Sequence, residues 1–228
     1  MSYIIPIVLL LLISVLPRWW VKKVFRENSE IRTDLPGTGG ELAEHLIQEL
    51  NYADISVVAT KEGDHFNPET GLIALNDLHF EGKSLTAIAV AAHEIGHLIQ
   101  HRNHEIMLEK RTELIKKTLP FRRFSGFALM LFPVAVLVFK SPLILLLFVA
   151  MGFSSTLLEA AIHLITLPVE LDASFRKALP ILQRGDYINK EDEPRIRKIL
   201  LAAALTYVAS ALAGLVDLSR WMRLIRRR

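Results

Sequence analysis

The sequence predicts a mostly helical membrane protein with about four transmembrane helices and a small α+β domain. Two observations support this fold class. Hydrophobic residues make up 51% of the 228 residues and the mean hydropathy is +0.33, which is more apolar than an ordinary soluble domain of this size. The apolar residues also gather in long runs, and a long polar stretch separates the first run from the second.

The first apolar run, Tyr3 to Leu16, ends at a proline and a basic residue and is followed by Trp19 and Trp20. A secretory signal peptide has a basic n-region and a small-residue cleavage site, and neither is present here. Paired tryptophans are typical of a membrane interface. Residues 1–20 are therefore predicted to be a retained N-terminal membrane anchor.

Residues 21–123 are predicted to form the α+β domain. Thr38-Gly39-Gly40-Glu41 is a capping box that begins a helix. The β-branched run Ile55 to Thr60 and the run Gly71 to Leu75 are predicted strands, and Lys61 to Thr70 between them has the composition of a loop.

Ser84 can cap a long helix in the same domain. This helix is expected to run to about Asn103 and to continue toward Leu119, where Pro120 ends it.

Two apolar runs, Phe124 to Phe139 and Pro142 to Leu167, are separated by Lys140-Ser141 alone. So short a joint predicts a transmembrane hairpin over residues 124–167. A polar segment, 168–198, follows it. Residues 199–228 comprise the last apolar run, which is predicted to be a C-terminal membrane helix, and a basic tail.

Basic residues flank the membrane repeatedly on the side of the α+β domain, whereas the hairpin tip carries Lys140 alone. The positive-inside rule therefore places this domain in the cytoplasm. The tail Arg226-Arg227-Arg228 contradicts this orientation if the last helix spans the membrane. Either that helix lies along the cytoplasmic face, or the other basic clusters outweigh the tail.

The strongest chemical signal is His93-Glu94-Ile95-Gly96-His97. Histidines at this spacing lie on one face of a helix and can chelate one metal ion. Zinc lowers the pKa of a bound water toward neutrality, and Glu94 can take the proton as general base. A chance pattern in a histidine-rich helix is the alternative, but the small residues of Ala87 to Ala92 favour a closely packed metal site.

A catalytic zinc needs a third protein ligand and one open position. The chain has no cysteine, so this ligand is a histidine or a carboxylate. The longer motif HExxHxxGxxH is ruled out by glutamine and asparagine at positions 100 and 103, so His101 and His104 are interpreted as supporting or surface residues. Glu170, where the chain returns from the hairpin, is the preferred third ligand. Asp172 is the alternative third ligand. Its other interpretation is a solvated carboxylate or a group that orients a ligand histidine.

Four segments together resemble the YugP-type bacterial membrane zinc peptidases. They are the HExxH motif, Leu167-Pro168-Val169-Glu170-Leu171-Asp172-Ala173-Ser174, Asp64-His65-Phe66-Asn67-Pro68 and Ala203-Ala204-Leu205-Thr206-Tyr207-Val208-Ala209. The resemblance covers nearly the whole chain. It implies a neutral zinc metallopeptidase of the bacterial cytoplasmic membrane and leaves the substrate open.

More distantly, the layout is similar to the membrane glutamate zincins of the HtpX and CAAX-protease type. Their third ligand lies in a Glu-x-x-Ala-Asp pattern, which Glu170 and Ala173 match. This similarity implies that Glu170 is a ligand. Ser174 replaces the aspartate that would orient a ligand histidine, so another group, for example Asp172, is expected to do so.

Other residues have both a functional and a structural interpretation. Gly71 to Leu75 is either an edge strand that pairs with an extended substrate or an ordinary half-buried strand. His65 and Tyr207 are possible stabilisers of the oxyanion in the transition state, with a structural role as the alternative. Glu159 and His163 share a helical face with Glu170, which indicates either a polar path from the membrane to the metal or hydrogen bonding between helices.

The sequence thus predicts a multi-pass membrane zinc metallopeptidase whose zincin-like domain contains the HExxH helix. One zinc ion is held by His93, His97 and Glu170, and Glu94 is the base. The expected partners are the lipid bilayer and a peptide or protein substrate, and the modest net charge of +3 gives no reason to expect nucleic acid. The alternative is a non-catalytic, zinc-stabilised scaffold with His101 or Asp172 as a fourth ligand. Another hydrolase substrate, such as a lipid amide, is also open.

Overall fold

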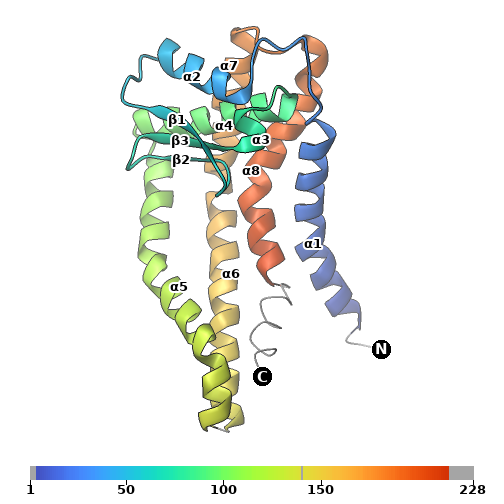
Figure 1. Cartoon of the computed structure of the whole chain (residues 1–228). Coiled ribbons are helices and arrows are strands. Elements are labelled where there is room, and N and C mark those ends of the chain that lie inside the picture. Colours follow the sequence, from blue (N-terminus) through green and yellow to red (C-terminus); the bar gives the residue numbers. More distant parts are fainter. Residues whose placement is uncertain (1–3, 140, 216–228) are drawn as a thin grey trace. The chain divides into compact units, whose positions relative to one another are not determined.

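The computed structural model describes residues 4–139 and 141–215, most of them in helices (Figure 1). The chain divides into two compact units. The helical unit contains the described residues of Met1–Arg18, Lys110–Thr166 and Tyr207–Arg228, and the α+β unit contains Trp19–Glu109 and Leu167–Thr206. The mostly helical fold with a small sheet is confirmed. Lys140 and the arginine-rich tail lie outside the described residues.

The α+β unit contains a three-stranded sheet in the order β1-β3-β2, with β1 at Ser56–Thr60, β2 at His65–Asn67 and β3 at Leu72–Asn76. β1 pairs with β3 in parallel and β2 pairs with it antiparallel. β3 is therefore the central strand, and the interpretation of Gly71 to Leu75 as an edge strand is wrong. The edge strand β2 lies inside the segment that was predicted as a loop. The prediction missed this strand because three residues are too few to show a strand pattern.

The predicted capping box is confirmed at the start of α2 (Gly39–Glu49). The Thr38 hydroxyl accepts a hydrogen bond from the Glu41 amide at 3.2 Å, and the Thr38 amide donates to the Glu41 carboxylate at 2.8 Å. Both bonds satisfy amides that the first turn leaves without helical partners. Leu42, Leu46 and Ile47 of this helix are buried.

The metal-motif helix α4 (Leu85–Arg102) follows the short helix α3 (Asp77–Phe80) and begins at Ser84, whose hydroxyl accepts from the Ala87 amide. Its expected continuation toward Leu119 is wrong. His104 adopts a φ of +50°, in the left-handed region, and this breaks the helix. A new helix, α5 (Ile106–Phe139), then runs through Pro120, which therefore does not end it.

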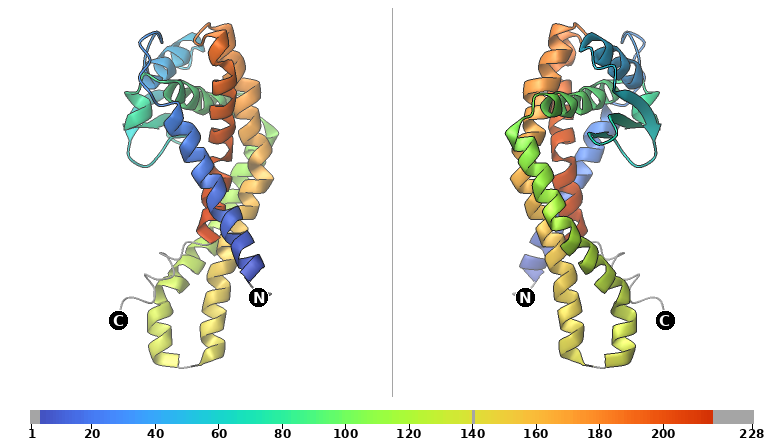
Figure 2. Two further views of the ribbon diagram at one scale, coloured as in Figure 1. Left: turned by 90° about the vertical axis from the view of Figure 1, so that its right-hand side faces the viewer. Right: turned by 90° about the vertical axis from the view of Figure 1, so that its left-hand side faces the viewer.

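α5 and α6 (Pro142–Asp172) form the predicted helical hairpin (Figures 1 and 2). The segment predicted as polar, 168–198, is largely helical. It contains the end of α6, the π-helix η1 (Ala173–Ala178), α7 (Leu179–Arg184) and the 3-10 turn η2 (Lys190–Asp192). The last apolar run lies in α8 (Glu193–Leu215), and the N-terminal helix is α1 (Ile4–Glu27).

By length and composition, two helices of the described chain could cross a membrane, at Pro142–Arg184 and Lys190–Ala213. About four were expected. The other two apolar runs, Tyr3 to Leu16 and Phe124 to Phe139, are short. At about 1.5 Å per residue they reach roughly 21 and 24 Å, whereas a bilayer core is ~30 Å thick.

Candidate metal centre

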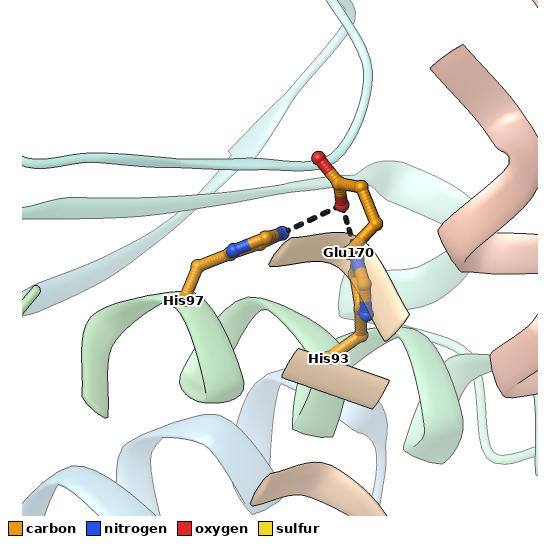
Figure 3. Close-up of side chains that lie close together, drawn as sticks. All are labelled: His93, His97 and Glu170. Carbon is orange, nitrogen blue, oxygen red and sulfur yellow. Dashed lines mark hydrogen bonds and ion pairs between the residues drawn. The ribbon is translucent and has the colours of Figure 1, made fainter. Parts of the chain in front are cut away.

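Three buried side chains of the α+β unit converge on one point. α4 presents His93 and His97 on successive turns, and α6 presents Glu170 opposite them (Figure 3). The Glu170 Oε2 atom lies 3.0 Å from His97 Nε2 and 3.4 Å from His93 Nε2. All three residues are buried, with 2–7% of their surface exposed.

This arrangement fits a metal ion. The three ligand atoms all lie within 4.8 Å of one another. Tetrahedral zinc with bonds of about 2.0 Å holds its ligand atoms roughly 3.3 Å apart, close to the 3.0 and 3.4 Å separations here. Two imidazole nitrogens and one carboxylate oxygen are also a donor set that zinc accepts. The group is therefore compatible with a metal ion.

Gly96 allows α4 to approach η1 closely enough to build the site. A Cβ atom at this position would lie 2.5 Å from the carbonyl oxygen and 3.0 Å from the carbonyl carbon of Ala173. Only glycine permits such backbone contact. Ala173 begins the π-helix directly after α6, and π-helical turns are frequent at functional sites. The glycine at the fourth position of the motif His93 to His97 is thus explained by packing.

His93 is supported by Ser174 from the π-helix. The Ser174 hydroxyl lies 2.9 Å from His93 Nδ1 and donates to the carbonyl oxygen of Leu200 in α8 at 2.8 Å. The expectation that a group other than Ser174 must orient a ligand histidine is therefore wrong for His93. A serine hydroxyl can accept from the imidazole as the aspartate would.

His97 is supported by Gln100, one turn further along α4. The Gln100 Oε1 atom lies 3.0 Å from His97 Nδ1, and its Nε2 donates to the Val169 carbonyl and to Asp172 Oδ2, both at 2.9 Å. Asp172 is not a member of the ligand group. It reaches His97 through Gln100, a residue that the sequence interpretation used only to reject a longer motif.

Glu94 lies beside the ligands with 5% of its surface exposed. Burial raises the pKa of its carboxyl to about 7; the negative charges of Asp64 and Glu170 act in the same direction, and His93 opposes them. The backbone of Phe66 in β2 lies close enough to this carboxyl to lower its pKa, against the effect of burial. The edge strand β2 therefore adjoins the carboxylate predicted to be the base.

The remaining histidines of this unit lie outside the ligand group. His65 is in β2, and its Nδ1 atom lies 2.9 Å from the carbonyl oxygen of Gly63. The His101 ring lies 5.7 Å from the Phe66 ring, and burial lowers the pKa of His101. His104 is exposed. The proposed role of His65 at the oxyanion stays a prediction.

No role was predicted from the sequence for the half-buried cluster around Asp64. Its carboxylate accepts from the Asn76 amide at 2.8 Å and lies 2.9 Å from His79 Nδ1. These bonds hold the start of β2 against the end of β3. The only sequence signal for this cluster was the position of Asp64 in one of the four segments that resemble the peptidase family.

Tyr207, Glu159 and His163 lie in the helical unit, whereas the metal centre lies in the α+β unit. The Tyr207 ring stacks on His163 with 5.4 Å between the ring centroids, and Glu159 forms an ion pair with Arg122 of α5 at 2.8 Å. These contacts agree with the structural interpretation of Glu159 and His163, in which they form polar and packing contacts between helices. The role of Tyr207 as an oxyanion stabiliser stays a prediction.

Comparison with known proteins agrees with this site. The family model described as "Putative neutral zinc metallopeptidase" matches residues 3–226. The chain is 35% identical over 207 residues to the "Putative membrane protease YugP" of Bacillus subtilis (strain 168). The aligned region covers 89% of this chain and 87% of the relative. No solved structure matches significantly. From the extent of both matches, the chain belongs to the family of putative neutral zinc metallopeptidases.

Proposed function

We propose that this chain is a membrane zinc peptidase that hydrolyses peptide bonds, with His93, His97 and Glu170 as metal ligands and Glu94 as general base. The observation that carries the proposal is the buried Glu94 carboxylate beside a group of three metal ligands. A zinc ion bound there would supply a Lewis acid and lower the pKa of water. Glu94 accepts the proton of the attacking water and delivers it to the leaving amine.

The number of ligands favours an enzyme over a scaffold. A structural zinc site is closed by four protein ligands, whereas a catalytic site keeps one position open. In the part of the chain that the structure describes, the ligand group has three members. The two residues considered as a fourth ligand have other contacts, Asp172 with Gln100 and His101 with the Phe66 ring.

The edge strand β2 supports a peptide as substrate. Its one strand partner within the described residues is β3, so its other edge can accept the backbone of an extended peptide. The Phe66 contact with Glu94 sets this edge next to the proposed base. We propose that the substrate adds to the sheet by pairing with β2. This strand then has the substrate-pairing role that the sequence suggested for β3.

We also propose that the protein resides in the bacterial cytoplasmic membrane with the α+β unit in the cytoplasm. The most apolar window of Pro142–Arg184 is only 19% buried inside the protein, which suits contact with lipid better than a place in a soluble core. Large apolar side chains are likewise exposed along α1, α5 and α6, for example Leu12, Leu16, Phe127, Val134, Leu146 and Ile165. On this proposal the short runs of α1 and α5 also enter the bilayer.

Replacing Glu94 by glutamine tests the catalytic proposal. Glu94→Gln keeps the size of the side chain and leaves the ligands intact, so we expect a full complement of zinc but hydrolysis reduced about 10²–10⁴-fold. The assay measures cleavage of fluorescently labelled casein and of a quenched peptide library by the purified protein in detergent. Glu113→Gln, an exposed glutamate on α5 that pairs with Lys117, is the matched control. Unimpaired cleavage by Glu94→Gln would remove Glu94 from the mechanism.

A further inference from the structure

The proton positions at the metal centre can be assigned from the partners of its two supporting side chains. The Leu200 carbonyl oxygen can only accept, and it lies 2.8 Å from the Ser174 hydroxyl. The hydroxyl hydrogen must therefore point to Leu200, since otherwise two oxygens would face each other without a hydrogen. The Ser174 oxygen is left as an acceptor, and the hydrogen of its 2.9 Å contact with His93 comes from Nδ1.

The amide of Gln100 is oriented by the same argument. Its Nε2 group faces two acceptors, the Val169 carbonyl and the Asp172 carboxylate, each at 2.9 Å. A flipped amide would set its oxygen against both of them, which is unfavourable. The Oε1 atom therefore faces His97 as an acceptor, and the hydrogen of this 3.0 Å contact comes from His97 Nδ1.

The Asp172 carboxylate that orients this amide is itself held in place. Lys177 of the π-helix lies 3.6 Å from Asp172 and 2.6 Å from Glu105, the residue before α5. The hydrogen bond with Glu105 raises the pKa of Lys177, so the ammonium stays charged. A continuous chain of contacts thus runs from His97 through Gln100 and Asp172 to this ion pair.

We propose that Ser174 and Gln100 are positioning residues that hold His93 and His97 in the tautomer with hydrogen on Nδ1. This inference rests on the proposed metal site and extends it. Each imidazole then offers the lone pair of Nε2, and both lone pairs meet Glu170 Oε2 at 3.4 and 3.0 Å. Three lone pairs converge in a buried space, which is the donor set that a divalent cation requires.

The test measures zinc affinity of the full-length protein in detergent by competition with a fluorescent zinc chelator. Ser174→Ala and Gln100→Met remove the acceptors with little change of volume, and each should weaken zinc binding about 10–100-fold. Thr86→Val is the matched control, because it removes a buried hydroxyl of α4 that bonds to the Phe25 carbonyl, away from the ligands.

The outcomes separate the two proposals. If the wild-type protein binds no zinc, the proposed function fails and this inference falls with it. If the wild type binds zinc and both Ser174→Ala and Gln100→Met bind it equally well, only the positioning inference is overturned. Thermal unfolding of the metal-free variants shows whether they fold.

A second measurement uses the unmodified chain and needs no variant. Nitrogen-15 NMR of the zinc-loaded, histidine-labelled protein should show two imidazoles with hydrogen on Nδ1 and zinc on Nε2. Coordination through Nδ1 would overturn the assignment.

Discussion

Replacing Gly96 by alanine should separate the two helices that build the metal centre. The added Cβ would lie 2.5 Å from the Ala173 carbonyl oxygen, and its three nearest neighbours are all backbone atoms of Ala173, at 2.5–3.2 Å. Backbone cannot rotate away as a side chain can, so α4 and η1 must move apart by roughly 0.5–1 Å to restore ordinary van der Waals contact. Zinc ligand distances tolerate only about 0.2 Å.

The expected magnitudes differ for stability and for metal binding. Overpacking costs about 1–3 kcal/mol, and the higher helix propensity of alanine returns about 1 kcal/mol. The net loss of stability is therefore about 0–2 kcal/mol, so the variant should fold. Zinc affinity should fall by at least about 10–100-fold, the range seen when supporting contacts of a zinc ligand are lost.

The assay combines thermal unfolding of the metal-free protein with zinc titration against a competing chelator. Gly126→Ala is the control, because a Cβ at this helical glycine of α5 would meet nothing within 4 Å. This control should keep its zinc affinity and gain about 1 kcal/mol of stability from the higher helix propensity of alanine. If Gly96→Ala binds zinc as tightly as the wild type, close approach of α4 to η1 is not what builds the site.

Two further predictions concern the third ligand and the topology. Glu170→Ala should lose zinc in elemental analysis, whereas Asp172→Ala should keep most of it; the reverse result would make Asp172 the ligand. Because the chain has no native cysteine, single cysteines can be probed in intact cells with a membrane-impermeant thiol reagent. We expect Ser141→Cys to label and Lys61→Cys to stay protected until lysis, and labelling of Lys61→Cys would invert the proposed orientation. Labelling of Arg227→Cys would indicate that the last helix spans the membrane, and protection that it lies on the inner face.

The sequence predicted the features that depend on local chemistry. A capping box is a contact between neighbours in the chain, so Thr38 and Glu41 revealed it directly. The spacing of His93 and His97 within one helix likewise needed no tertiary information. Glu170 lies far along the chain and was chosen from the position of its segment and from a resemblance, and the structure brings it to both histidines.

Features that depend on distant contacts were missed. β2 is three residues long, so no periodic pattern marked it, and its place at the sheet edge comes from pairing with β3. The role of Ser174 depends on the Leu200 carbonyl of another helix. The end of α4 before Leu119 depends on a left-handed backbone at His104, a conformation that no residue type there demanded.

X-ray absorption at the zinc edge of the zinc-loaded wild-type protein tests the central claim most directly. We expect one zinc per chain with four nitrogen or oxygen neighbours at about 2.0–2.1 Å. Two of the neighbours should show the outer-shell scattering of imidazole, one should be a carboxylate and one should come from solvent. A third imidazole, or a shell closed by four protein ligands, would contradict a catalytic site built from His93, His97 and Glu170.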